Sequence, residues 1–175
     1  QPQNPYSITK YCAEQMAEKL AEHYDMDILV TRSFNHYGPG QKPGFVVSDF
    51  ARQIARIARG DQPPVLRVGD LTAMRDFTYV SDVIGAYIAL VESDAPRGIY
   101  NICSGQARRM DDILARMIRI AQLDIQVEQD PAKLRPSDVP YFVGDASKLK
   151  AATHWQPHVT IEDGLAKTIT SWQEP

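Results

Sequence analysis

The stretch Asp27–Gln41, DILVTRSFNHYGPGQ, joins an apolar run to a turn-rich polar loop. The β-branched apolar residues of 27–32 predict a buried parallel strand, and residues 33–41 predict a loop. Because ligands of open α/β sheets bind at the carboxyl ends of the strands, Asn35 and His36 are placed where a ligand could sit. The alternative interpretation is a capping Asn and a turn His.

Strands and helices alternate along the rest of the chain, which predicts α/β layers. Apolar residues recur at helical spacing in several segments, and short β-branched or aromatic runs indicate strands between them. The expected helices are 5–23, 49–59, one capped by Ser81 or Asp82, 110–121, 147–152 and 161–172, and the expected strands are 27–32, 65–68, 77–80, 98–103, 125–128 and 141–143.

Tyr6 and Lys10 are four residues apart in the first expected helix, so they lie on one face, one turn apart. Asn4 suits the N-cap of this helix and Pro5 its first position. A nearby ammonium favours the phenolate, so the pair could exchange a proton with an alcohol or an alkoxide. The alternative is a plain amphipathic helix with a buried Tyr and a solvated Lys.

Two arginines stand in polar loops between the apolar elements. Arg75 precedes a short expected strand, and Arg135 is restrained to extended backbone by Pro136. Because guanidinium groups bind phosphate oxygens in pairs, the two arginines together could neutralise a diphosphate. The alternatives are a structural Arg75 paired with Asp76 or Asp82, and an Arg135 exposed in its loop.

Composition argues against several classes of function. The 175 residues are 43% hydrophobic and 23% charged, as in soluble globular proteins, and the net charge of −3 provides no basic field for nucleic acid. We find no apolar run long enough to span a bilayer, so no membrane partner is expected, and no signal peptide. The spacing of Cys12 and Cys103 suits no metal, and reduced thiols in a cytoplasmic protein are the simplest expectation.

Four segments, taken in order, resemble the extended short-chain dehydrogenase/reductase family, the nucleotide-sugar epimerases, dehydratases and reductases. They are the Tyr6/Lys10 pair, RSFNHYGPGQ at 32–41, RDFTYVSD at 75–82 and RPSDV at 135–139. The resemblance covers nearly the whole chain. It is strongest to GDP-6-deoxy-4-keto-mannose reductases, through FNHYGPGQ, FVV at 45–47 and RVGDL at 67–71. GDP-mannose 4,6-dehydratases typically carry Glu-Ser-Pro-Arg after Phe-Asn-His, where YGPG stands here.

The resemblance implies a role for each matching residue. Tyr6 would be the acid/base and Lys10 would hold the nicotinamide ribose and favour the phenolate. Cofactor contacts are implied for Tyr6, Lys10, Phe34 and His36, and substrate contacts for Asn35, Phe45, Val46, Arg67, Arg75, Arg135 and Asp138. The implied reaction is hydride transfer from NADP- or NAD-type cofactor to the C4 ketone of a GDP-linked 6-deoxy-hexose, with no metal.

The same resemblance implies the C-terminal part of a Rossmann-type fold, with its last parallel strands and a smaller α/β substrate-binding lobe. Residues 1–34 would end the Rossmann domain, and residues 35–175 would form mainly the nucleotide-sugar-binding lobe, with segments returning to the Rossmann sheet. A homodimer through the helix of Tyr6 and Lys10 is also implied.

The family's glycine-rich phosphate turn and the Ser/Thr of its catalytic trio are absent from these residues. The chain also opens directly on the helix that would carry the chemistry, and such a helix normally needs a scaffold on both sides. We therefore expect a chain whose first half is missing and which has no dehydrogenase activity alone. Three alternatives stay open: a dehydratase, an epimerase, and a non-catalytic fragment that binds a nucleotide sugar.

Overall fold

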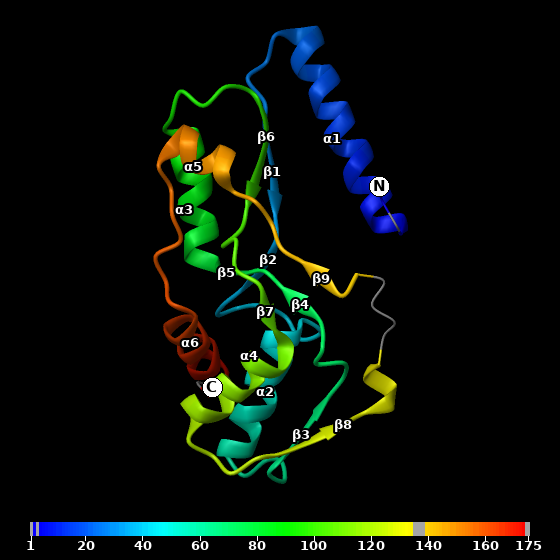
Figure 1. The fold of residues 1–175 in the computed structure, drawn as a ribbon, viewed down its shortest axis with the longest axis vertical. Helices are drawn as coiled ribbons and strands as arrows, with labels where there is room; N and C mark the ends of the chain where they lie inside the picture. The colour runs from blue at the N-terminus through cyan, green and yellow to red at the C-terminus, as the bar shows by residue number, and fades with distance from the viewer. Residues whose placement is uncertain (1, 3, 135–138, 174–175) are drawn as a thin grey trace.

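The computed structural model describes residues 2, 4–134 and 139–173. Figure 1 shows an elongated arrangement, in which helices α3 (Val80–Val91) and α5 (Ser147–Thr153) lie at one end with strands β1 (Leu29–Ser33) and β6 (Gly98–Ile102). Helices α2 (Val46–Ala58), α4 (Met110–Ala121) and α6 (Ile161–Gln173) pack together at the other end. Each end has its own cluster of buried apolar side chains.

Strand β1 pairs in parallel with β6, with Leu29 opposite Gly98 and Ser33 opposite Ile102. Behind them, α3 and α5 close a core that includes Leu90, Tyr100 and Leu149, all nearly inaccessible to solvent. The parallel pairing expected for this strand is confirmed, but its complete burial is not. Strand β1 is only half-buried, because within the described residues β6 is its single strand neighbour.

Helix α1 (Pro5–Tyr24) begins as its sequence predicts. Asn4 accepts a hydrogen bond from the backbone of Ser7, and the Ser7 hydroxyl accepts one from the backbone of Asn4, which forms a capping box. Pro5 occupies the first turn, and Asp25 ends the helix in the left-handed conformation. Most of α1 is exposed, and Ala21 is its single buried residue.

The second core lies between α2, α4 and α6 and two pairs of parallel strands. Strand β2 (Asn35–Tyr37) pairs with β5 (Phe77–Tyr79), and β3 (Val65–Val68) pairs with β8 (Gln126–Gln129). The short strand β4 (Met74–Arg75) pairs with β7 (Arg108–Arg109) and β9 (Tyr141–Phe142), and a 3-10 helix, η1 (Pro131–Lys133), follows β8. The most buried large side chains here are Tyr37, Val47, Ile54, Leu66, Ile113, Met117 and Leu165.

Three local expectations were wrong. Asn35–Tyr37 forms a strand rather than part of a loop, because β5 provides its hydrogen-bond partners. Helix α2 begins at Val46, three residues earlier than expected. Neither Ser81 nor Asp82 caps α3, whose N-cap is Tyr79 with no side-chain cap. Tertiary pairing overrides local turn and capping signals at each of these places.

Asp82 instead joins α3 to the segment before α6. Its two carboxylate oxygens accept hydrogen bonds from the backbone N–H groups of His158 and Val159, both at 3.1 Å. Its backbone oxygen also accepts a hydrogen bond from Trp155 Nε1 at 3.0 Å. A buried carboxylate thus joins two segments, the start of α3 and the segment before α6, that are far apart in sequence.

Gly164 of α6 allows a close approach of Tyr37. A Cβ at Gly164 would overlap the Tyr37 hydroxyl and lie 2.9 Å from the ring atom Cδ2 of Tyr79. Tyr37 cannot withdraw easily, because its ring also packs edge-on against Phe77. We therefore expect Gly164→Ala to lower the free energy of unfolding by about 1–3 kcal/mol, measured in urea, although Ala favours helices.

Gly85 of α3 is the matched control. A Cβ there meets only Trp155 Nε1, at 3.8 Å, which is an ordinary contact. Gly85→Ala should stabilise the protein by about 0.5–1 kcal/mol. If the two substitutions change stability in the same direction, packing against Tyr37 is not what requires Gly164.

Candidate active site

A cleft of about 760 Å³ opens where the start of α1, the end of β1, the start of α2 and strands β3 and β4 approach one another. Its lining brings together most of the residues predicted from the sequence. Those on the cleft are Tyr6, Phe34, Asn35, His36, Phe45, Val46, Arg67 and Arg75. Lys10 is not part of the lining, and Arg135 and Asp138 lie outside the described residues.

Tyr6 stands at the mouth of this cleft with 71% of its surface exposed. Lys10 follows one turn later, and its Nζ lies 5.6 Å from the centre of the Tyr6 ring. At this distance the ammonium is attracted to the ring face. The helical spacing therefore does bring the phenol and the ammonium together.

One wall of the cleft is formed by Phe34, Asn35 and His36, in and just before β2. Phe34 stacks on Phe142, with ring centres 4.8 Å apart. The amide nitrogen of Asn35 donates a hydrogen bond to the backbone oxygen of Asp76 at 3.2 Å. His36 Nδ1 lies 3.3 Å from the backbone oxygen of Phe34, and His36 remains exposed. The wall thus combines an aromatic surface, an amide and an imidazole.

Asp76 supports this wall through hydrogen bonds, a role that was not predicted from the sequence. Its carboxylate is fully buried and accepts hydrogen bonds from Ser104 N (2.8 Å), Ser104 Oγ (2.6 Å) and Gly105 N (2.8 Å). Gly144 N lies 3.3 Å from the same carboxylate. The signal in the sequence is an Asp directly before an apolar strand, because a carboxylate at the edge of the core needs hydrogen-bond donors.

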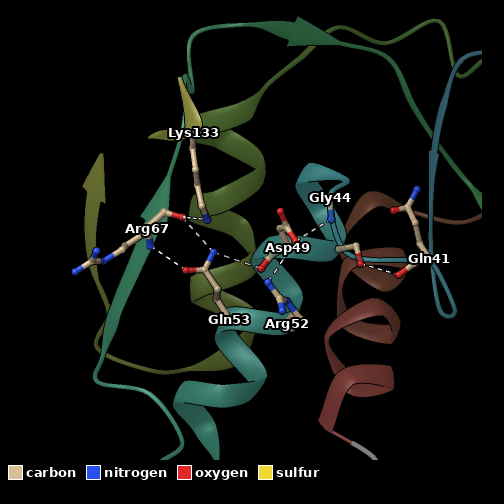
Figure 2. A network of polar contacts seen from close by, with 8 residues as sticks. Gln41, Gly44, Asp49, Arg52, Gln53, Arg67 and Lys133 are labelled. Atoms are coloured by element: carbon tan, nitrogen blue, oxygen red, sulfur yellow. Dashed lines mark hydrogen bonds and ion pairs between the residues drawn. The ribbon is translucent and has the colours of Figure 1, made fainter. Parts of the chain in front are cut away.

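Gln53 is a second residue that the sequence analysis missed. From α2, its side-chain oxygen accepts the backbone N–H of Arg67 at 2.9 Å, and its side-chain nitrogen donates to the backbone oxygen of Arg67 at 3.1 Å. Lys133 Nζ donates to that same oxygen at 3.0 Å. Figure 2 shows the Arg67 guanidinium extending away from this carboxamide. The Gln53 carboxamide thus satisfies both backbone polar groups of Arg67, as a strand partner would, in addition to the pairing of β3 with β8.

The loop before α2 is held by polar contacts at both of its ends. Gly44 N donates to Asp49 Oδ1 at 3.1 Å, and Ser48 Oγ donates to the backbone oxygen of Gln41 at 2.8 Å (Figure 2). Gln41 in turn donates its side-chain N–H to the backbone oxygen of His36. These bonds fix the backbone around Phe45 at the edge of the cleft.

Arg75 donates hydrogen bonds to backbone oxygens. Within the part of the chain that the structure describes, the ion pair with Asp76 or Asp82 that the sequence left open is not formed. Its Nη1 donates to Met74 O at 2.8 Å and lies 3.4 Å from Pro140 O. The two carboxylates, Asp76 and Asp82, are engaged by backbone N–H groups elsewhere. Arg75 is half-buried and lines the cleft.

The charges on the cleft favour an anion. Among the described residues, its lining contains three basic side chains, Arg67, Arg75 and Lys133, and two carboxylates, Asp49 and Asp70. Asp49 accepts a backbone N–H and lies 3.8 Å from Arg52, and hydrogen bonds from Thr72 lower the pKa of Asp70. This local excess of positive charge contrasts with the net charge of the chain, which is −3.

Thiol chemistry is not favoured here. Cys103 lies behind the cleft and is fully buried, and this burial raises the pKa of its thiol to about 11. Within residues 2, 4–134 and 139–173 there is no cluster of three or more His, Cys, Asp or Glu that could hold a metal ion. In the same residues no helix is both long and apolar enough to cross a bilayer.

Comparison with known proteins agrees with this geometry. Residues 1–168 match the model of the family described as GDP-mannose 4,6 dehydratase. The chain belongs to this family. Its fold is that of the C-terminal part of a Rossmann-type extended short-chain dehydrogenase/reductase, so the resemblance drawn from the sequence is confirmed.

A curated sequence and a solved structure, both from Pseudomonas aeruginosa, are especially similar. The GDP-6-deoxy-D-mannose reductase of Pseudomonas aeruginosa is 37% identical over 98% of this chain, which covers 57% of that protein. The solved structure of RMD from Pseudomonas aeruginosa with NADPH superimposes with a TM-score of 0.94 at 36% identity, over 99% of this chain and 57% of that one.

A more distant relative of the family carries both of its ligands. The structure of UDP-glucuronic acid 4-epimerase from Bacillus cereus, with UDP-glucuronic acid and NAD, gives a TM-score of 0.83 at 26% identity. It is matched over 98% of this chain and 53% of its own. The chain thus spans a little over half the length of the relatives that it matches.

Proposed function

We propose that the full-length protein reduces the C4 ketone of GDP-4-dehydro-6-deoxy-mannose with NADPH or NADH, to a GDP-rhamnose-type product. The observation that carries this proposal is the 37% identity to a GDP-6-deoxy-D-mannose reductase over 98% of the chain. The sequence YGPG at 37–40, in place of the Glu-Ser-Pro-Arg typical of the dehydratases, supports reduction over dehydration.

The residues of this chain suit one end of such a cofactor. Tyr6, Phe34 and His36 line the cleft, where an aromatic ring, a phenol and an imidazole could contact a nicotinamide and its ribose. Lys10 lies beside Tyr6. The bound cofactor supplies the hydride. The glycine-rich turn that would hold its diphosphate is not among residues 1–175.

Tyr6 provides the proton in this mechanism. Its phenol donates a proton to the carbonyl oxygen as negative charge develops there, and the Lys10 ammonium stabilises the phenolate that remains. The phenol and the ammonium thus act together as a general acid.

Another part of the cleft suits a nucleoside diphosphate. Arg67, Arg75 and Lys133 supply positive charge for the phosphates, and the backbone around Phe45 and Val46 lies where a base could be held. Asn35 lines the same cleft, on the strand that follows β1. The roles of Arg135 and Asp138 in this binding stay predictions.

The test is turnover by the full-length protein with GDP-4-dehydro-6-deoxy-mannose and GDP-mannose in parallel, each with NADPH, NADH or NAD(P)⁺. We expect ketone reduction in the first case, seen as loss of absorbance from the reduced cofactor. A second candidate, GDP-mannose 4,6-dehydratase, is favoured by the description of the matching family. Consumption of GDP-mannose without ketone reduction would establish that candidate instead.

Residues 1–175 alone provide a further test. We expect them to bind a GDP-sugar weakly and to show no turnover, because they lack the cofactor's phosphate turn. Turnover by this chain alone would contradict that expectation. Binding without turnover by the full-length protein would instead favour a non-catalytic nucleotide-sugar-binding protein.

We also propose that α1 pairs with its copy in a homodimer. Ile8, Met16 and Leu20 form an apolar stripe along this helix, and each is 39–61% exposed within residues 1–175. The alternative is that this stripe packs within its own subunit. Burying such a stripe in a second subunit would remove it from water. Light scattering of the full-length protein tests this, and a strict monomer would overturn it.

A further inference from the structure

Glu14 is an unusual residue on α1. It follows Tyr6 and Lys10 at the same spacing of four, so the three side chains share one helix face. Most side chains of α1 are exposed, yet the side chain of Glu14 is only 9% exposed. A carboxylate that is nine-tenths buried needs a charged or hydrogen-bonding partner.

That partner is Arg32 of β1. Arg32 Nε donates to Glu14 Oε2 at 2.7 Å, and Arg32 Nη2 donates to Glu14 Oε1. Two parallel bonds between a planar guanidinium and a carboxylate restrict rotation as well as distance. The hydrogen bond to Glu14 also raises the pKa of Arg32. The pair therefore joins α1 and β1 as a fork, in which the Glu14 carboxylate is largely buried and the Arg32 side chain is 51% exposed.

The two residues occupy positions that matter for the cleft. Arg32 lies at the end of β1, directly before Ser33 and Phe34, which line the cleft. Its backbone is held in register opposite Asn101 of β6. Glu14 lies eight residues after Tyr6, which is about 12 Å along a helix. The fork thus connects the helix that carries Tyr6 to the strand that leads into the wall of the cleft at β2.

A second contact holds the other end of α1. Arg97 donates to the backbone oxygen of Ala21 at 3.1 Å and to Asp25 Oδ1 at 2.8 Å. The Asp25 side chain is 90% exposed, so this ion pair is screened by solvent. Of these two contacts within residues 1–175, the Arg32 fork is the nearer to Tyr6, so its loss would displace Tyr6 more than loss of the Arg97 contact.

We propose that Glu14 and Arg32 are positioning residues, which hold the Tyr6-bearing turn of α1 at a fixed distance from the β1–β2 wall of the cleft. This inference rests on the proposed function, because the position of Tyr6 matters only where Tyr6 donates a proton. Loss of the fork changes the rate of the proton-donating step more than it changes substrate binding, since the predicted phosphate contacts lie on other elements.

The experiment compares Arg32→Gln and Arg32→Lys with Arg97→Gln in the full-length protein. We expect Arg32→Gln to lower kcat about 10- to 100-fold, with KM for the ketosugar changed by less than about threefold. Arg32→Lys keeps the charge but not the fork, and should recover part of kcat. Arg97→Gln, which loosens the far end of α1, should change kcat by less than about threefold.

Hydrogen exchange provides a readout that does not depend on activity. Amides of 9–16 in α1 should exchange faster in Arg32→Gln than in the wild type, and more so than in Arg97→Gln. Unchanged exchange in α1 would overturn the inference, as would equal losses of kcat in the Arg32 and Arg97 variants. If the wild type shows no turnover, the proposed function fails, and exchange still decides whether the fork holds α1.

Discussion

Replacement of Tyr6 by Phe should remove most of the ketone reductase activity of the full-length protein, with kcat about 10²- to 10⁴-fold lower. The substitution deletes one oxygen, which is the proposed proton donor, and keeps the ring beside Lys10. Because the substitution removes one hydroxyl and keeps the ring, it should change the free energy of unfolding by no more than about 1.5 kcal/mol, the contribution of one hydrogen bond. Steady-state kinetics and urea unfolding measure the two effects separately.

Tyr11 provides the matched control on the same helix. It is 46% exposed and does not line the cleft, so Tyr11→Phe should leave both kcat and stability nearly unchanged. If Tyr6→Phe retains more than about a tenth of wild-type kcat, another group donates the proton. A similar loss in both variants would instead show a general effect of α1 on activity.

Replacement of Asp76 by Ala should cause the largest loss of stability, about 3–5 kcal/mol. The carboxylate is fully buried, and it accepts hydrogen bonds from both the backbone and the hydroxyl of Ser104 and from the backbone of Gly105. Without it, these donors remain buried with no acceptor. A lower urea midpoint with an unchanged m-value would show this loss directly.

Asp76→Asn tests the charge separately from the shape. The amide is nearly isosteric, but its NH₂ group would face N–H donors, so we expect a large part of the loss to remain. Asp94→Asn is the control, because Asp94 is exposed. If the urea midpoint of Asp76→Asn equals that of Asp94→Asn, this carboxylate has no role in stabilising the fold.

Much of the fold could be predicted from residues that are close in sequence. Asn4 and Pro5 specify the start of α1, and helical spacing of apolar residues marks α4 correctly at 110–121. These signals are local, since capping and amphipathic spacing act within a few residues. The division into domains at residue 34 stays a prediction.

The candidate site was predictable only in part. Tyr6, Asn35 and His36 were identified from their motifs, and the structure places all three on one cleft. Gln53 and Asp76 were missed, because an isolated Gln in a helix and an Asp beside an Arg have no distinctive pattern. Their importance comes from partners that are 14 to 29 residues away.

The sequence by itself determined the helix that carries Tyr6 and Lys10, the alternation of helices with most of the strands, and the family. Only the tertiary structure decided that Asn35–Tyr37 becomes a strand, that Asp82 binds the segment before α6, and that Glu14 meets Arg32. The physical reason is the range of the interactions. A helix satisfies its hydrogen bonds within itself, whereas a strand edge or a buried carboxylate needs partners that only folding brings near.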